Sequence, residues 1–441
     1  MLNWGSGRED WRVDENAGHA GHAGHAGYAD TVAGHSHAHS TLPAVPTSRT
    51  VARATLLTLL AVAVLTVLGM VWLWPSQAAV GQMVDRAQAL TGVTESVRGE
   101  VLGVSDPCAE ATAADGPTQC VEASIGLLSG PDAGRLVTVA LTGGLDTAVV
   151  SRGDQVQLAA SERVFAEGAE PARGEMTMSY TFAGVDRTLP LVVLALLFAG
   201  VVIAVGRRRG LFALLALGVS GAVLGFFVLP ALVSGGPGLL IGMVGSTAIM
   251  FVTLFFVHGW NLRTAAALIG TLFGILMVSA ISLIAVASTR LSGVGDEASG
   301  FLTGLAAGLD LRGLLTCSIL IAGLGVLNDI TIAQASSVWE LRAAAPHLPR
   351  REIYARAMRI GRDHIASTVY TVVFAYVGAA LSVLILLYLA EAPVLALFTR
   401  EDIAIEVVRT LCGSIGLVLA VPVTTAAAAW LVAPERPVDA T

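Results

Sequence analysis

The stretch LLTCSILIAGLGVLNDITIAQASSV (314–338) decides the fold, because a run this long and apolar is typical of a membrane-spanning helix. It contains a single acid, Asp329, which directly follows Asn328. A carboxylate at mid-membrane depth costs roughly 2.5–3.5 kcal/mol on insertion scales, so such residues are usually paired or functional. At about 1.5 Å per residue, Asp329 lies deep toward one membrane face rather than at the centre.

The composition extends this reading to most of the chain. Of 441 residues, 54% are hydrophobic and only 13% are charged, with a mean hydropathy of +0.72. Soluble domains are normally about 25% charged. Apolar runs occur near 55–74, 190–206, 210–230, 238–257, 263–288, 312–335, 366–389 and 406–432. The sequence therefore predicts a polytopic α-helical membrane protein of about eight spans, or seven if one shorter run is not a span.

The regions outside the spans differ in composition. Residues 1–50 are polar, repetitive and histidine-rich, which predicts a disordered cytoplasmic tail. Residues 51–75 form the first span. We expect an uncleaved anchor rather than a signal peptide, because the apolar stretch of a signal peptide is only about 7–15 residues long. Residues 76–188 hold short β-type runs between turn residues and no long amphipathic helix. They predict a small all-β domain, an OB-like barrel or a sandwich, with the barrel favoured.

Residues 189–433 form a seven-span membrane domain, and 434–441 a second cytoplasmic tail. Arginines concentrate in alternate loops, at Arg207–Arg209, at Arg263 and in the segment 338–362. The positive-inside rule then places both termini in the cytoplasm and the β-domain outside. Ile353, Ala357 and Ile360 share one face of the basic segment 338–362. That pattern predicts a helix lying along anionic lipid headgroups, or alternatively one that docks a partner.

Polar residues around Asp329 form the main candidate site. Thr331 follows it, and Arg362 with Asp363 opens the next apolar run at a comparable depth. Two readings stay open: a structural ion pair between Arg362 and Asp329, or a site for a substrate, ion or proton. Further candidates are Asp310 and Arg312, which either cap the helix start or pair at the outer surface.

Two further patterns have both a chemical and a neutral reading. Cys108 and Cys120 lie in the outside domain, where a disulfide is permitted, although two unpaired thiols remain the alternative. The tail histidines have side chains that bind Zn²⁺ or Ni²⁺ loosely, although a glycine-rich coil preorganises no site. They are His19, His22, His25, His35, His37 and His39.

Several function classes are excluded. The chain has no lysine, so it carries neither a P-loop nor a Schiff-base site. We expect no enzyme activity and no cofactor, and the net charge of −7 argues against nucleic acid as a partner. Two hypotheses remain. One is a permease or secondary transporter of an unknown small solute or ion, with or without a separate ATPase or regulatory partner. The other is a scaffold, envelope-assembly factor or sensor that presents the β-domain. Monomer and homo-oligomer both stay open.

Several stretches together resemble the YibE/F-like membrane proteins. They are GLDLRGLL (308–315), GLGVLNDITIAQASSVWEL (323–341), IGRDHIASTVYTVVFAYVG (360–378), GRRRGLFALL (206–215), LLSGPDAGRLVTV (127–139), GDQVQL (153–158) and DRTLPL (186–191). The resemblance covers roughly 95–432. The family pattern has an acid where Asp329 stands and an Arg-Asp pair where Arg362 and Asp363 stand. Asn328 departs from it, since family members often have an apolar residue there. The resemblance implies the architecture and a location in a bacterial plasma membrane, and it implies no particular activity.

Overall fold

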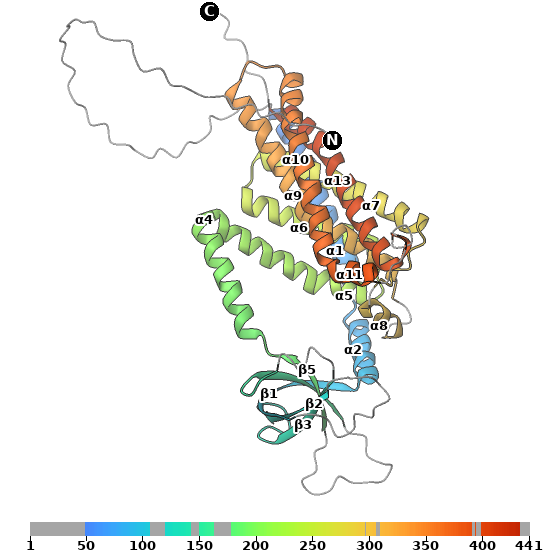
Figure 1. Ribbon diagram of the computed structural model, residues 1–441. Coiled ribbons are helices and arrows are strands. Elements are labelled where there is room, and N and C mark those ends of the chain that lie inside the picture. The colour runs from blue at the N-terminus through green and yellow to red at the C-terminus, as the bar shows by residue number, and fades with distance from the viewer. Residues whose placement is uncertain are drawn as a thin grey trace, which may run out of the picture. The chain divides into compact units, whose positions relative to one another are not determined.

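The computed structural model describes residues 49–105, 120–142, 150–162, 178–295, 297–305, 309–389, 393 and 398–432 (Figure 1). The chain forms a helical bundle and a separate antiparallel sheet. The helices are α1 (Arg49–Trp72), α2 (Gln77–Thr91), α4 (Thr188–Val223), α5 (Leu229–Val233), α6 (Gly238–His258), α7 (Leu262–Ser288), α8 (Glu297–Leu305), α9 (Leu311–Ala344), α10 (Arg350–Ala379), α11 (Leu381–Leu389) and α13 (Glu401–Leu431). A π-helical turn at Leu224–Val228 joins α4 to α5.

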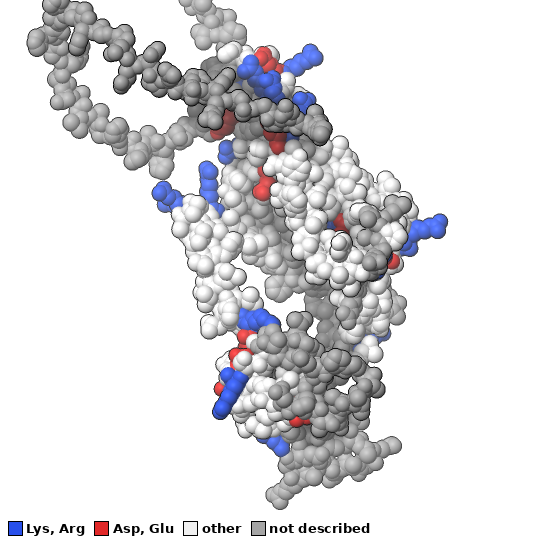
Figure 2. Space-filling view, in the orientation of Figure 1, with Lys and Arg blue, Asp and Glu red and all other residues white. Residues whose placement is uncertain are grey.

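The apolar helices indicate a multi-pass membrane protein. Six helical stretches of the described residues are long and apolar enough to cross a membrane. The count becomes seven if α10 and α11, which meet at a 63° bend, form one broken span. Figure 2 shows few charged side chains along the helices, and basic ones gathered at the end where α10 begins. The expected number of eight stays a prediction, because it depends on how α4 is counted.

Helix α4 contains two of the runs that the sequence predicts as separate spans. Its backbone breaks at Arg207, where φ is 52° and ψ is −130°. A Cβ at Gly210 would overlap the carbonyl group of Val202. In a straight helix, residues eight apart are about 12 Å apart, so the chain reverses sharply here. The break at Arg207 is where the sequence places a loop between two spans.

The basic segment 338–362 is not a separate surface helix, and that prediction is wrong. Its first part is the last turns of α9, and its second part is the start of α10. Ile353 and Ala357 are fully buried in the bundle core, while Ile360 is exposed. Arg342 fixes the turn between the helices, since its Nη1 donates to the carbonyl oxygens of Pro346 at 2.9 Å and Leu348 at 2.6 Å. The bundle therefore takes up the apolar face that was expected on lipid.

Helix α9 is the centre of the bundle. It packs against α6, α7, α10 and α13. Glycines allow the closest of these approaches: a Cβ at Gly238 of α6 would overlap the backbone of Gly313, and one at Gly242 would lie 3.1 Å from Cys317 Cα. Small residues of this kind are how membrane helices gain packing contact without a hydrophobic driving force. The result is a helix whose side chains are mostly enclosed by protein.

The five strands form a curled antiparallel sheet. They are β1 (Val93–Ser105), β2 (Cys120–Leu127), β3 (Leu136–Thr142), β4 (Gln155–Glu162) and β5 (Met178–Val185), in the order β3-β2-β1-β4-β5. The register of β1 shifts between Val101 and Gly103 against β2, and between Val93 and Glu95 against β4. Such irregularities bend a strand and increase its twist. The edge strands β3 and β5 thereby approach each other around one apolar core.

Helix α2 lies within 76–188, where the sequence analysis found no long amphipathic helix. Ser76 caps its first turn by accepting a hydrogen bond from the Ala79 amide, and Gly92 ends it with φ at 65°. Both residues are standard signals for a helix start and stop. Val80, Met83, Val84 and Leu90 recur at helical spacing, so the sequence does carry an apolar stripe, although no described residue of α2 is buried.

A polar clasp joins the two sides of the curled sheet. Asp132, in the turn between β2 and β3, is 9% exposed. It accepts hydrogen bonds from Tyr180 Oη of β5 at 2.9 Å and from Arg135 Nη1 at 3.0 Å. Burial, and then the hydrogen bond to Asp132, raises the pKa of Tyr180 to about 12.

Replacing this carboxylate should shift the titration of Tyr180. In Asp132→Asn the negative charge is removed and the hydrogen bond weakens, so the pKa of Tyr180 should fall from about 12 toward its ordinary value of 10.0. The pKa of Tyr180 is measured by following phenolate absorbance against pH in each protein and subtracting the absorbance of the same protein carrying Tyr180→Phe. In the parent chain the stability that the neutral phenol contributes should be full below pH 10 and be lost as pH rises toward 12. An unchanged pKa in Asp132→Asn would contradict the clasp.

Candidate functional site

Asp329 lies on an exposed face of α9, not in the interior of the bundle. Within the described part of the chain, its carboxylate makes no hydrogen bond or ion pair. Asp329, Arg209 and Arg263 all lie close enough to His258 to act on its imidazole electrostatically. This places Asp329 beside the end of α6 and the start of α7, at the arginine-rich end of the bundle. The sequence predicted that depth, although not the outward direction.

The other residues predicted with Asp329 separate into two groups. Arg362 and Asp363 are exposed on α10, and no ion pair joins Arg362 to Asp329 among the described residues. Thr331 instead is fully buried. Whether Asp329, Arg362 and Asp363 have a functional role stays a prediction. No contact between the described residues supports an ion pair between Arg362 and Asp329.

The remaining predicted residues are placed more simply. Asp310 caps α9, because its Oδ1 accepts a hydrogen bond from the Gly313 amide at 2.9 Å. Arg312 is exposed, and no described ion pair links it to Asp310. Cys108 and the tail histidines lie outside the described residues, as does the side chain of Cys120, so these predictions remain as they stand. Among the residues that the structure does describe, no cluster of His, Cys, Asp or Glu has the makings of a metal site.

A buried polar layer lies where α7, α9 and α13 meet. Its members are fully buried hydroxyl or amide side chains: Thr271, Thr331, Gln334, Thr424 and Thr425. The hydroxyls of Thr271 and Thr331 are hydrogen-bonded at 2.8 Å across α7 and α9. Polar side chains that face the interior of a membrane bundle mark pathways and sites more often than those that face lipid.

Gln334 is the central member of this layer. Its Nε2 donates to the carbonyl oxygen of Ala357 in α10 at 2.9 Å and to Thr425 Oγ1 in α13 at 2.7 Å. Gly361 lets α10 come this close, since a Cβ there would lie 2.8 Å from Gln334 Oε1 and 2.9 Å from Val421. One amide therefore ties three helices together.

Two acceptors at this level of the described bundle have no hydrogen-bond partner. They are Gln334 Oε1 and Asn328 Oδ1, and both are buried. Leaving such a group unpaired costs about 1–3 kcal/mol. Each oxygen is able to accept a hydrogen bond from a water or a passing solute. The unusual Asn328 thus contributes an inward acceptor, while its neighbour Asp329 faces outward.

A small cavity lies between α9, α10 and α13, on the other side of the bundle's middle from Gln334. It measures about 150 Å³ and is lined by Gly323, Tyr376, Arg409 and Gly413 among others. Two glycines create the space: a Cβ at Gly323 would have Gly413 Cα as its nearest atom, at 3.9 Å, and one at Gly413 would meet nothing within 4 Å. This is the reverse of Gly361, where the space is already taken.

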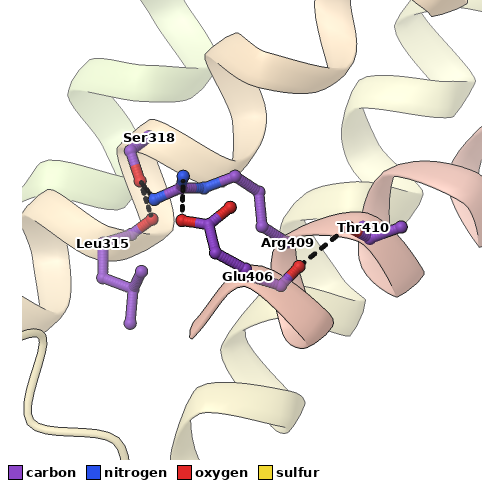
Figure 3. A network of polar contacts seen from close by, with 5 residues as sticks. All are labelled: Leu315, Ser318, Glu406, Arg409 and Thr410. Atoms are coloured by element: carbon purple, nitrogen blue, oxygen red, sulfur yellow. Dashed lines mark hydrogen bonds and ion pairs between the residues drawn. The ribbon is translucent and has the colours of Figure 1, made fainter. Parts of the chain in front are cut away.

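An embedded charge pair borders the cavity (Figure 3). Arg409 Nη1 donates to Glu406 Oε1 at 2.7 Å, and its Nη2 reaches Ser318 Oγ of α9 at 3.5 Å. The side chain of Arg409 is 23% exposed and that of Glu406 is 30% exposed. Arg409 Nε is buried and has no partner in the described structure. The cavity therefore has a guanidinium edge with an unused donor.

The sequence analysis missed Glu406 and Arg409. Both lie in the first residues of the apolar run 406–432, and neither was considered as a candidate. Helix α13 in fact begins at Glu401, which puts Arg409 about 12 Å along its axis. The available signal was the spacing of three between an acid and an arginine on one helix face, within a segment that continues apolar.

A comparison with protein families now adds to this geometry. The model of the family described as YibE/F-like protein matches residues 194–434. The chain belongs to the YibE/F-like family. The match includes α6, α7, α9, α10 and α13, and so both the polar layer and the cavity of this YibE/F-like protein. It does not include the sheet, so the resemblance seen upstream of 194 stays a prediction. Searches of curated proteins and of solved structures found no match.

Neutralising Asp329 should leave the fold intact. Asp329→Asn removes an exposed charge that has no partner in the described structure, so the protein's stability should change by no more than about 0.5 kcal/mol. Membrane abundance and the Tm in detergent measure this. A large loss of folded protein would instead reveal a structural partner for the carboxylate.

Adding one methyl group at the polar layer should be costly. In Gly361→Ala the new Cβ meets Gln334 Oε1 and Val421, and overpacking of this kind costs about 1–3 kcal/mol. The matched control is Gly378→Ala on the same helix, where a Cβ meets nothing within 4 Å. We expect Gly361→Ala to lower the Tm and Gly378→Ala to leave it unreduced. Equal Tm values would argue against the close approach of α10 to α9.

Proposed function

We propose that this chain is a permease or secondary transporter that moves a small polar solute or ion along the seam between α9, α10 and α13. The observation that carries the proposal is the pairing of a cavity edged by Arg409 with a buried layer that holds an unpaired acceptor at Gln334. Val326 at the cavity and Gln334 are eight residues apart on α9, about 12 Å along its axis. Both polar places therefore lie on one seam of the bundle.

Buried apolar side chains lie between these two places. Ile330 of α9 and Leu417 and Val421 of α13 are at most 3% exposed. The seam is thus closed at this level, as an alternating-access transporter requires in its resting forms. A rearrangement that separates α10 from α13 would join the cavity to the layer.

The orientation and location belong to the same proposal. The protein lies in a bacterial plasma membrane. The arginine-rich end of the bundle, where α10 begins, faces the cytoplasm, and the cavity lies toward the outside. Both termini are then inside. The curled sheet is extracytoplasmic, and its order, with the edges β3 and β5 brought together, favours a small OB-like barrel. A separate ATPase or regulator, and assembly as a monomer or a homo-oligomer, are both compatible with this arrangement.

Filling the cavity should stop transport. In Gly323→Val the branched side chain enters the space opposite Gly413, where a Cβ at Gly323 would lie 3.9 Å from its nearest atom, Gly413 Cα. Purified protein in liposomes is offered chloride, phosphate, acetate, glycine and a proton gradient, one at a time. We expect the parent chain to move at least one of these, and Gly323→Val to slow it about tenfold, equivalent to roughly 1.4 kcal/mol on the barrier.

The matched control lies two residues further along α9. Gly325 is exposed, and a Cβ there meets nothing within 4 Å, so Gly325→Val should keep the parent rate. A scaffold that only presents its sheet would move none of the probes and would be indifferent to both substitutions. If the parent moves a probe and both variants match it, the seam is not the pathway.

A further inference from the structure

A groove that shares no lining residue with the seam's cavity lies where α1 packs against α6 and α7. We propose that the groove between α1, α6 and α7 binds one anionic phospholipid, with an acyl chain along the groove and the phosphate at Arg53. The groove has a volume of about 390 Å³, which is within the range of small-molecule sites. It is independent of the proposed transport seam.

The packing of α1 explains why a groove exists there. Near its C-terminal end, α1 is close to α6, because a Cβ at Gly69 would lie 2.9 Å from Val244 Cγ2. Toward its N-terminal end, side chains rather than glycines face α6 and α7. Leu56, Leu59 and Leu60 of α1 line one wall of the groove. The two helices therefore diverge toward the arginine-rich end, and the opening is apolar.

The other wall is aromatic and ends at a membrane-interface residue. Phe251 and Phe255 of α6 line it, and Trp260 stacks on Phe255 with ring centroids 4.4 Å apart and planes 11° apart. Trp260 is 82% exposed. Tryptophan is enriched at the headgroup level of membranes, where one face is apolar and the edge is polar. Its position marks the depth at which a headgroup would lie.

The charge at this end identifies the headgroup class. Arg53 lines the groove, and none of the described residues lining it is acidic. Arg263, in the first turn of α7, adds a second positive charge at the same end. Guanidinium groups near a membrane surface attract anionic lipids, each contributing about 1 kcal/mol. A zwitterionic lipid would fill the same apolar groove without this attraction.

The test is native mass spectrometry of the purified chain in detergent, with phosphatidylglycerol or phosphatidylcholine of identical acyl chains added. We expect one phosphatidylglycerol to bind in preference to phosphatidylcholine. Arg53→Gln should weaken phosphatidylglycerol binding about fivefold and reduce the preference. Ala63→Phe, which places a ring in the groove, should weaken binding of both lipids.

The matched control is Arg351→Gln, an exposed arginine at the same end of the bundle but on α10. It should leave lipid binding at the parent level. The proposal is overturned if the two lipids bind the parent equally. It is also overturned if Arg351→Gln weakens binding as much as Arg53→Gln, or if phosphatidylglycerol still binds fully when the groove is filled.

Discussion

The bundle depends on one requirement: a polar group inside a membrane protein has to find its partner within the protein. Gln334 shows what this imposes. Its amide reaches a backbone carbonyl of α10 and a hydroxyl of α13, so the positions of both helices relative to α9 follow from one side chain. The approach needs Gly361, because any larger residue would meet the amide. The polar layer and the helix arrangement therefore explain each other.

Glycine serves two opposite purposes along these helices. A Cβ at Gly270 would overlap Thr424, and one at Gly416 would overlap Val278, so these glycines bring α7 and α13 together. Gly323 and Gly413 instead face each other with space between them, and a cavity results. The first kind makes the bundle tight, and the second leaves one place in it loose. Between α9, α10 and α13, the second kind leaves a space in the described structure, and Arg409 borders that space.

The sequence predicted the membrane class, the sheet domain and the positions of the apolar runs, because long hydropathy and short alternating runs are local properties. It did not predict which face of a helix is enclosed. Asp329 and Thr331 are neighbours on α9, yet one is exposed and the other buried. Facing depends on all of the helices that surround α9, and a nearly uniform apolar run has too weak a moment to reveal it. Glycines recur three or four residues apart, as at Gly242 and Gly245 or at Gly270 and Gly274, but the sequence does not distinguish glycines that bring helices together from those that leave space.

Asp329 and Glu406 show why an isolated charge is an incomplete guide. Asp329 stands out in sequence because it lies in a long apolar run, yet it is exposed and lies at the arginine-rich end of the bundle. Glu406 is less conspicuous, being near the start of its helix, but it holds Arg409 against a cavity and α9. The surroundings of a charged side chain in the folded bundle are therefore a better guide to its role than its contrast with neighbouring residues in the sequence. In this bundle the enclosed face is the one that carries Arg409, Gly323 and Gln334, and α9 is the helix on which two of the three lie.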